Sequence, residues 1–297
     1  MRAVLNSSRV GARALGADLP IGESGSPESR SEGGFEIFSA FNPLYSLAGF
    51  VVGALVGLTG VGGGSLMTPV LVLLFGFHPA TAVGTDLLYA SFTKSVGTVV
   101  HNKRATVDWK IVGGLALGSV PASIATLSLM AYFGVRSAHS AFLLNALLGG
   151  ALLVTSIAVF FRPWILRWAG HHIAAMESER VTRWTVLLGA TLGVLVSITS
   201  VGAGALGTTA LLILYPKLPI ARIAGSDIAH AVPLTLIAGI GHWLMGSVDL
   251  TLMAALLLGS VPGIIVGSLF ATRSSDAVLR PILAVTLLVS ALRLLTA

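Results

Sequence analysis

Two glycine-rich interruptions of apolar sequence carry the clearest chemical potential in this chain. The first reads Thr59-Gly60-Val61-Gly62-Gly63-Gly64-Ser65, and the second reads Thr199-Ser200-Val201-Gly202-Ala203-Gly204. Glycine allows backbone geometry that other residues avoid, and it leaves amide N–H groups accessible. A short helix that starts at such a break points free N–H groups and the positive end of its dipole at the gap. This arrangement binds anions without a permanent charge.

We therefore predict that the two breaks form a binding site for a small anionic substrate. Thr68 and Thr208 would lie one turn inside the helices that follow and would add hydroxyl donors. The alternative is that the glycines only allow close helix crossing. Their occurrence twice, beside short apolar segments, favours the binding site. The residues assigned to it are Gly62, Gly63, Gly64, Ser65, Thr68, Lys94, Gly202, Gly204 and Thr208.

A stripe of polar residues lies in the apolar segment 80–101. At about 100° per residue, one helix face carries Asp86, Tyr89, Thr93, Lys94, Gly97 and His101. The corresponding face of segment 220–243 carries Asp227, His230, Thr235, Ala238 and His242. Ionisable groups within a membrane span are costly, and they usually face a cavity or one another.

Asp86, Asp227 and His230 are the candidates for proton coupling. The two carboxylates either face a cavity, where they exchange protons as hydration changes, or cap the end of a neighbouring helix. His230 is interpreted first as a packed, hydrogen-bonded residue and alternatively as a proton carrier.

Lys94 lies about 21 Å into its segment by helical rise. Three interpretations stay open, namely a substrate counter-ion, an ion pair with an aspartate, and snorkelling to the surface. Asp108 and Asp249 directly precede apolar runs and are predicted helix N-caps, and the histidines at positions 101 and 242 are predicted to be interfacial. These residues form no ligand cluster, so we predict no metal, no cofactor and no catalytic residue.

The composition requires a membrane as the surroundings of these residues. Apolar residues make up 55% of the chain and charged residues 10%, with a mean hydropathy of +0.90. A soluble domain carries about 25% charge. The net charge of +6 comes from basic residues between apolar runs. This pattern indicates membrane topology and does not indicate a nucleic-acid-binding surface. With no cysteine, disulfides and thiol chemistry are excluded. The partners expected are the lipid bilayer and a small anion, and a homo-oligomer is left open.

Ten apolar segments follow a polar N-terminal stretch. They cover residues 43–58, 65–76, 80–101, 109–132, 138–161, 181–198, 205–215, 220–243, 250–271 and 276–296. The predicted parts are a disordered tail (1–42), membrane repeat 1 (43–161), a cytoplasmic connecting loop (162–180) and membrane repeat 2 (181–297). Spanning needs about 20 residues, so the second segment of each set is too short. The first two segments of each set are therefore expected to form a broken or re-entrant helix pair.

The two halves repeat one another in sequence. Thr68 matches Thr208 at an offset of 140, and Asp86 matches Asp227 at an offset of 141 after one inserted residue. The tetrapeptide Gly118-Ser119-Val120-Pro121 is identical to Gly259-Ser260-Val261-Pro262. A gene duplication explains this agreement.

The positions of the basic residues predict the orientation of the halves. Lys and Arg concentrate in the odd-numbered connections, so these loops are expected in the cytoplasm and both termini outside. The connection 101–108 is basic, whereas its counterpart 242–249 has no Lys or Arg. The predicted fold is an all-α, polytopic membrane protein with two inverted-topology repeats, each holding a glycine-broken or re-entrant helix pair and three full transmembrane helices. Secondary transporters have this organisation.

The motifs also resemble a known family. Gly60-Val61-Gly62-Gly63-Gly64-Ser65 with Pro69, then Ala82-Val83-Gly84-Thr85, then His101 leading to Val107-Asp108-Trp109, are similar to the sulfite exporter TauE/SafE family. The resemblance extends from about Leu47 to Leu295. It implies a secondary transporter of sulfite, sulfoacetate or related sulfur oxyanions in the bacterial inner membrane, often working outwards. It also implies that Gly62 to Ser65 and Gly202 to Gly204 line the path.

The predicted function is therefore export of small sulfur-containing anions, such as sulfite or organosulfonates, by alternating access with proton coupling. Two alternatives remain at this point. An intramembrane hydrolase would use Ser65 as nucleophile, but its nearest base, His101, lies at the end of its span. A passive anion channel is the other alternative.

Overall fold

Helices form the regular structure of the part of the chain that the computed structural model describes, namely residues 43–59, 66–133, 138–173, 178–270 and 276–296. The predicted tail and the residues Gly62 to Ser65 lie outside these ranges. The helices are α2 (Pro43–Thr59), α3 (Met67–Leu73), α4 (Pro79–Lys103), α5 (Trp109–Phe133), α6 (Ala138–Phe160), α7 (Arg162–Ile173), α8 (Ser178–Thr199), α9 (Ala205–Leu214), α10 (Ile220–Leu244), α11 (Leu250–Phe270) and α12 (Asp276–Thr296).

Ten of these eleven helices fall on the ten predicted segments, and the chain is an all-α, polytopic membrane protein. Within the described residues, five stretches are long and apolar enough to cross a membrane: Trp109–Phe133, Phe142–Phe160, Glu179–Thr199, Ile220–Leu244 and Leu250–Gly267. The second helix of each half is short, with 7 residues in α3 and 10 in α9. Each lies directly after a glycine-rich break, as the sequence predicts.

The connection between the halves differs from the prediction of a loop over residues 162–180, because it contains the helix α7. Pro163 lies in the first turn of α7, where its missing N–H costs no hydrogen bond. The segment is too rich in Arg and His to be an apolar span. After Pro163 it has no helix breaker before the glycine at position 170, so a short helix can form there.

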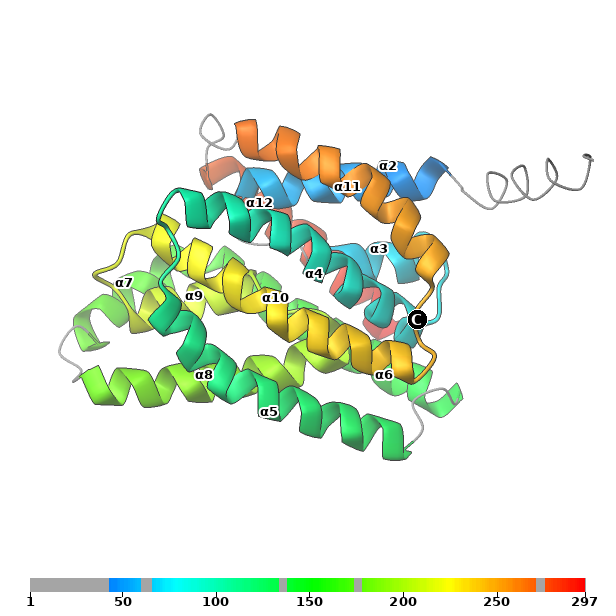
Figure 1. Cartoon of the computed structure of the whole chain (residues 1–297), viewed down its shortest axis with the longest axis horizontal. Coiled ribbons are helices and arrows are strands. Elements are labelled where there is room, and N and C mark those ends of the chain that lie inside the picture. The colour runs from blue at the N-terminus through cyan, green and yellow to red at the C-terminus, as the bar shows by residue number, and fades with distance from the viewer. Residues whose placement is uncertain (1–42, 60–65, 134–137, 174–177, 271–275, 297) are drawn as a thin grey trace, which may run out of the picture. The chain divides into compact units, whose positions relative to one another are not determined.

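The first and fourth helices of opposite halves pack together. Figure 1 shows α2 beside α11, and α5 packs in the same way against α8. At these crossings a Cβ on Gly49 would overlap the Leu256 carbonyl, and a Cβ on Gly189 would overlap the Leu115 carbonyl. The two contacts are equivalent under the sequence repeat. Each half therefore completes its packing with a helix of the other half.

The third and fifth helices pack against their own equivalents in antiparallel fashion. Between α4 and α10, Leu88 lies against Gly239 and Gly97 against Ile228, so the residue numbers run in opposite directions. Between α6 and α12, Gly149 lies against Leu295, and the Ser156 hydroxyl donates to the Ala284 carbonyl at 2.8 Å. Antiparallel equivalent helices support the predicted inverted repeat.

Reciprocal hydrogen bonds join the helix ends of the two halves. The Asp108 N–H donates to the Ser226 hydroxyl at 2.8 Å, and the equivalent Asp249 N–H donates to the Thr85 hydroxyl at 3.0 Å. Each aspartate also accepts from a backbone N–H in the first turn of the helix that follows, from Lys110 at 3.1 Å and from Leu252 at 2.9 Å. The predicted N-caps are confirmed.

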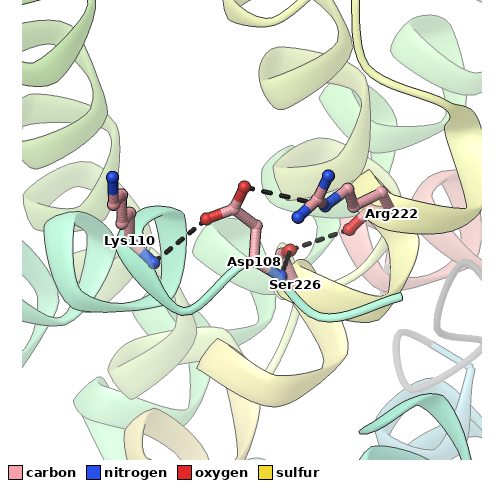
Figure 2. Close-up of polar contacts among 4 residues, drawn as sticks. All are labelled: Asp108, Lys110, Arg222 and Ser226. Carbon is pink, nitrogen blue, oxygen red and sulfur yellow. Dashed lines mark hydrogen bonds and ion pairs between the residues drawn. The ribbon is translucent and has the colours of Figure 1, made fainter. Parts of the chain in front are cut away.

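An ion pair distinguishes one of these ends from the other. Figure 2 shows the Arg222 guanidinium approaching Asp108, with 3.7 Å between Nε and Oδ2. The residue equivalent to Arg222 is Thr81, which has no charge to offer Asp249. The ion pair is partly exposed, so its contribution to stability is about 0–1 kcal/mol.

The glycine crossings make a direct prediction for stability. In Gly118→Ala the new Cβ overlaps the Val186 carbonyl oxygen, and neither backbone can move without disturbing the α5–α8 contact. Overpacking of this kind costs about 1–3 kcal/mol. The unfolding midpoint of the detergent-solubilised protein should fall, whereas Gly113→Ala on the same helix, with nothing within 4 Å, should keep it or raise it. Equal midpoints for the two variants would contradict the described crossing.

The inverted repeat predicts the sides on which equivalent residues are accessible. Because the chain has no cysteine, Asn102→Cys and Trp243→Cys each provide one thiol, at exposed positions 141 residues apart. Asn102→Cys should react with a membrane-impermeant maleimide only in inverted vesicles, and Trp243→Cys only in right-side-out cells. Labelling of both thiols from the same side would rule out the inverted orientation.

Candidate functional site

The second glycine break separates α8 from α9 over residues 200–204. Ser200, Gly202 and Gly204 have φ angles of 58°, 123° and 135°. Glycine adopts these values readily, but a serine there is uncommon. The backbone therefore leaves the helical path, and α9 starts afresh at Ala205.

Asp86 connects α4 to both short-helix regions. Its Oδ2 accepts hydrogen bonds from the Thr68 N–H at 3.2 Å, from the Thr68 hydroxyl, and from the Ser200 hydroxyl at 3.0 Å. Thr68 lies in the first turn of α3, so the carboxylate caps that helix. Of the two interpretations of Asp86, capping describes its contacts here.

Asp227 repeats part of this arrangement in the second half. Its Oδ2 accepts from the Thr208 hydroxyl of α9 at 3.0 Å. A Cβ on Gly207 would overlap Asp227 Oδ1, so the carboxylate packs directly against the backbone of α9. The predicted hydroxyl donors Thr68 and Thr208 therefore both bind the aspartate of their own half.

Lys94 lies in the interior and crosses between the halves. Its side chain is 4% exposed, and Nζ donates to the Ala203 carbonyl in the second break at 2.9 Å. Snorkelling to the surface is therefore the wrong interpretation. The ammonium interacts electrostatically with Asp227 and Asp86, although neither carboxylate forms an ion pair with it within 4.0 Å.

The histidines of α10 are packed and hydrogen-bonded. His230 Nε2 lies 2.8 Å from the Ser119 hydroxyl of α5. His242 Nε2 lies 2.9 Å from the Ser197 carbonyl. The prediction of an interfacial histidine is wrong at position 242, which is 1% exposed because Gly84 and the turn after α10 pack over it. His101, whose Nδ1 lies 2.9 Å from the Thr106 hydroxyl, is half-buried at the end of α4.

The polar stripes of α4 and α10 face the protein interior. Asp86, Tyr89, Asp227 and His230 are at most 1% exposed, and each keeps one polar atom without a hydrogen-bond partner among the described residues. These atoms are Asp86 Oδ1, the Tyr89 hydroxyl, Asp227 Oδ1 and His230 Nδ1. Buried polar atoms are normally partnered, so each of these four atoms calls for an explanation, such as a water, an ion or a functional role.

The sequence missed two contributors to this cluster. Ser200 was within the second break, but a serine beside glycines gave no sign that it would reach an aspartate of the other half. Ser119 lies within the repeated tetrapeptide. That repeat indicates the duplication, but it does not indicate that Ser119 contacts a histidine. Both contacts depend on the pairing of the halves.

The Ser119–His230 pair is also the closest described approach to hydrolase chemistry. Its separation suits a nucleophile and a base. A working base is oriented by a third group, whereas His230 Nδ1 has no partner among the described residues. Ser119 is fully buried.

Comparison with known proteins places the chain among membrane transporters. The family described as Sulfite exporter TauE/SafE matches residues 45–294. The chain is 40% identical over 252 residues to "Probable membrane transporter protein YjnA" of Bacillus subtilis (strain 168), covering 84% of this chain and 98% of that protein. It is 29% identical over 256 residues to "Probable membrane transporter protein YdhB" of the same organism, covering 85% and 99%.

A more distant similarity reaches the archaea. The chain is 26% identical over 214 residues to "Probable membrane transporter protein MJ0441" of Methanocaldococcus jannaschii, covering 70% of this chain and 74% of that protein. No solved structure matches the chain significantly. The helical architecture, the glycine breaks and the family match agree, and the chain belongs to the sulfite exporter TauE/SafE family of membrane transporters.

Proposed function

We propose that this transporter exports small sulfur oxyanions, such as sulfite or organosulfonates, across the bacterial inner membrane by proton-coupled alternating access. The observation that carries the proposal is the gathering of Lys94, Asp86 and Asp227 at the second break and along α4 and α10. These helices are equivalents from the two halves and cross in antiparallel fashion. In transporters built from inverted repeats, substrate and coupling ions bind at such a repeat interface.

The proposed anion site combines the backbone of the two breaks with Lys94. In this proposal the amides of Gly62, Gly63, Gly64, Ser65, Gly202 and Gly204 are the uncharged donors, and of these residues the structure describes Gly202 and Gly204. Lys94 supplies the ammonium, whose bond to the Ala203 carbonyl fixes its position while leaving two of its three N–H donors for the anion. Substrate counter-ion is thus the interpretation of Lys94 that we retain.

The charge balance of the cluster supports proton coupling. With all three groups ionised, Asp86, Asp227 and Lys94 sum to a charge of −1. An anion entering beside two carboxylates is repelled unless a proton arrives with it, since charges interact strongly away from water. Protonation of Asp227 would also weaken the bond from Thr208 and leave that hydroxyl for an anion oxygen. Asp86 and His230 are the further proton carriers that we propose.

The reciprocal helix-end contacts support alternating access. The Asp108–Ser226 bond links the start of α5 to α10, and the equivalent Asp249–Thr85 bond links the start of α11 to α4. In an inverted repeat, breaking one link while keeping the other opens the interior to one side only. The same small set of contacts would then act as two gates.

Lys94→Ala should reduce anion flux into proteoliposomes by about tenfold or more, because a hydrogen bond to a charged group contributes about 1.5–3 kcal/mol. The measurement is flux of labelled sulfite and of organosulfonates against concentration. Lys103→Ala, which removes an exposed ammonium from the same helix, is the matched control and should transport normally. Unchanged flux in Lys94→Ala would contradict its role, and a conductance that never saturates would indicate a channel.

Proton coupling makes a second prediction in the same system. A proton gradient across the vesicle membrane should accelerate anion efflux by the wild type. An outward gradient does so where the proton and the anion move together, and an inward gradient does so where they are exchanged. Asp227→Asn should lose this acceleration and keep anion exchange at zero gradient, since the neutral amide removes the need for a proton. The surface variant Glu179→Gln should respond as the wild type does. A full response in Asp227→Asn would show that another group carries the proton.

A further inference from the structure

The partner of the Lys94 ammonium is a type of group that holds free cations in other transporters. At broken helices, unwound carbonyls and the C-terminal ends of half-helices coordinate Na⁺ or H⁺. The second break supplies both features, because α8 ends at Thr199 and Ala203 lies between two glycines with positive φ. Lys94 Nζ lies 2.9 Å from the Ala203 carbonyl oxygen.

Two buried carboxylates act electrostatically on the ammonium held at this carbonyl. Asp86 is hydrogen-bonded to Ser200 of the same break, and Asp227 of α10 is hydrogen-bonded to Thr208 of α9. Each keeps Oδ1 without a partner among the described residues, and each interacts electrostatically with the ammonium. Carbonyl, carboxylate and hydroxyl oxygens are the ligands that hard cations prefer.

The ammonium of Lys94 has no equivalent in the second half. The equivalent of Lys94 in the second half is Thr235, whose hydroxyl donates to the Ala231 carbonyl of its own helix at 2.8 Å. The scaffold of paired breaks and paired aspartates is therefore present in both halves, whereas the positive charge is present in one. Because one half has this scaffold without the ammonium, the repeat architecture does not by itself require a positive charge.

We propose that Lys94 is a tethered cation, whose ammonium fills a monovalent-cation subsite at the Ala203 carbonyl, where Asp86 and Asp227 act on it electrostatically. The protein therefore needs no free Na⁺ at this place, and loss of the ammonium would open the subsite to Na⁺. The inference rests on the proposed function only in placing the subsite beside the anion path. Binding of the cation itself requires no transport.

The test begins with Lys94→Thr, which introduces the residue of the second half. Thermal unfolding of the purified protein in detergent is measured in NaCl, with choline chloride replacing it at constant ionic strength. The midpoint of Lys94→Thr should rise by about 3–5 °C when Na⁺ is at about ten times its Kd. The wild type and Lys103→Thr, which loses an exposed ammonium from the same helix, should not respond.

A chemical restoration of the ammonium guards against a variant that folds poorly. Because the chain has no cysteine, Lys94→Cys carries a single thiol. The thiolate displaces bromide from 2-bromoethylamine, which forms a thioether and an ammonium at nearly the length of lysine. Lys94→Cys should respond to Na⁺ before alkylation and lose the response after it, with the modification verified by mass spectrometry.

Three outcomes would overturn the proposal. One is the lack of any Na⁺-specific shift in both Lys94→Thr and unmodified Lys94→Cys. Another is a wild-type shift as large as that of the variants, because the ammonium would then not occupy the subsite. The third is an undiminished shift in Lys94→Thr combined with Asp227→Asn, because Asp227 would then not contribute to cation binding. Since chloride is the same in both salts and no sulfur oxyanion is present, these results are independent of whether the protein moves sulfur oxyanions.

Discussion

A helix that is broken inside a membrane must find partners for its exposed backbone groups within the protein, because lipid offers none. In this transporter, α4 supplies them. Asp86 accepts the Thr68 amide at the start of α3, and Lys94 donates to the Ala203 carbonyl in the break before α9. One helix therefore stabilises short helices of both halves. Its carboxylate accepts a hydrogen bond from an N–H of one half, and its ammonium donates to a carbonyl of the other.

This requirement explains why charged residues can be kept at such depth. An isolated carboxylate or ammonium in the interior is strongly disfavoured, and it persists only with hydrogen bonds and opposite charges nearby. Asp86 has three donors around one oxygen, and Lys94 has a carbonyl with two carboxylates in electrostatic range. The groups that stabilise the breaks are therefore also the groups from which the proposed ion-binding site is built.

The duplication accounts for the packing contacts that the two halves share, and later substitutions account for the polar groups in which they differ. Packing contacts such as Gly49 with Leu256 and Gly189 with Leu115 are the same in both halves, as are the links from Asp108 and Asp249. The chemistry differs, because Lys94 corresponds to Thr235, Tyr89 to His230 and Arg222 to Thr81. The two halves therefore share a packing frame and differ in the polar side chains placed on it.

The sequence by itself determined the segments, the repeat, the N-caps Asp108 and Asp249 and the inward polar stripes, because each follows from local periodicity or from an offset along the chain. It also singled out Lys94, since an ammonium that deep needs a partner. Only the tertiary structure decided what that partner is. Ser200 reaches Asp86 and the Ala203 carbonyl reaches Lys94 across more than 100 residues, and His242 is covered by a turn packed against Gly84. Such contacts arise from the way two halves interlock, and no local pattern encodes which atoms then meet.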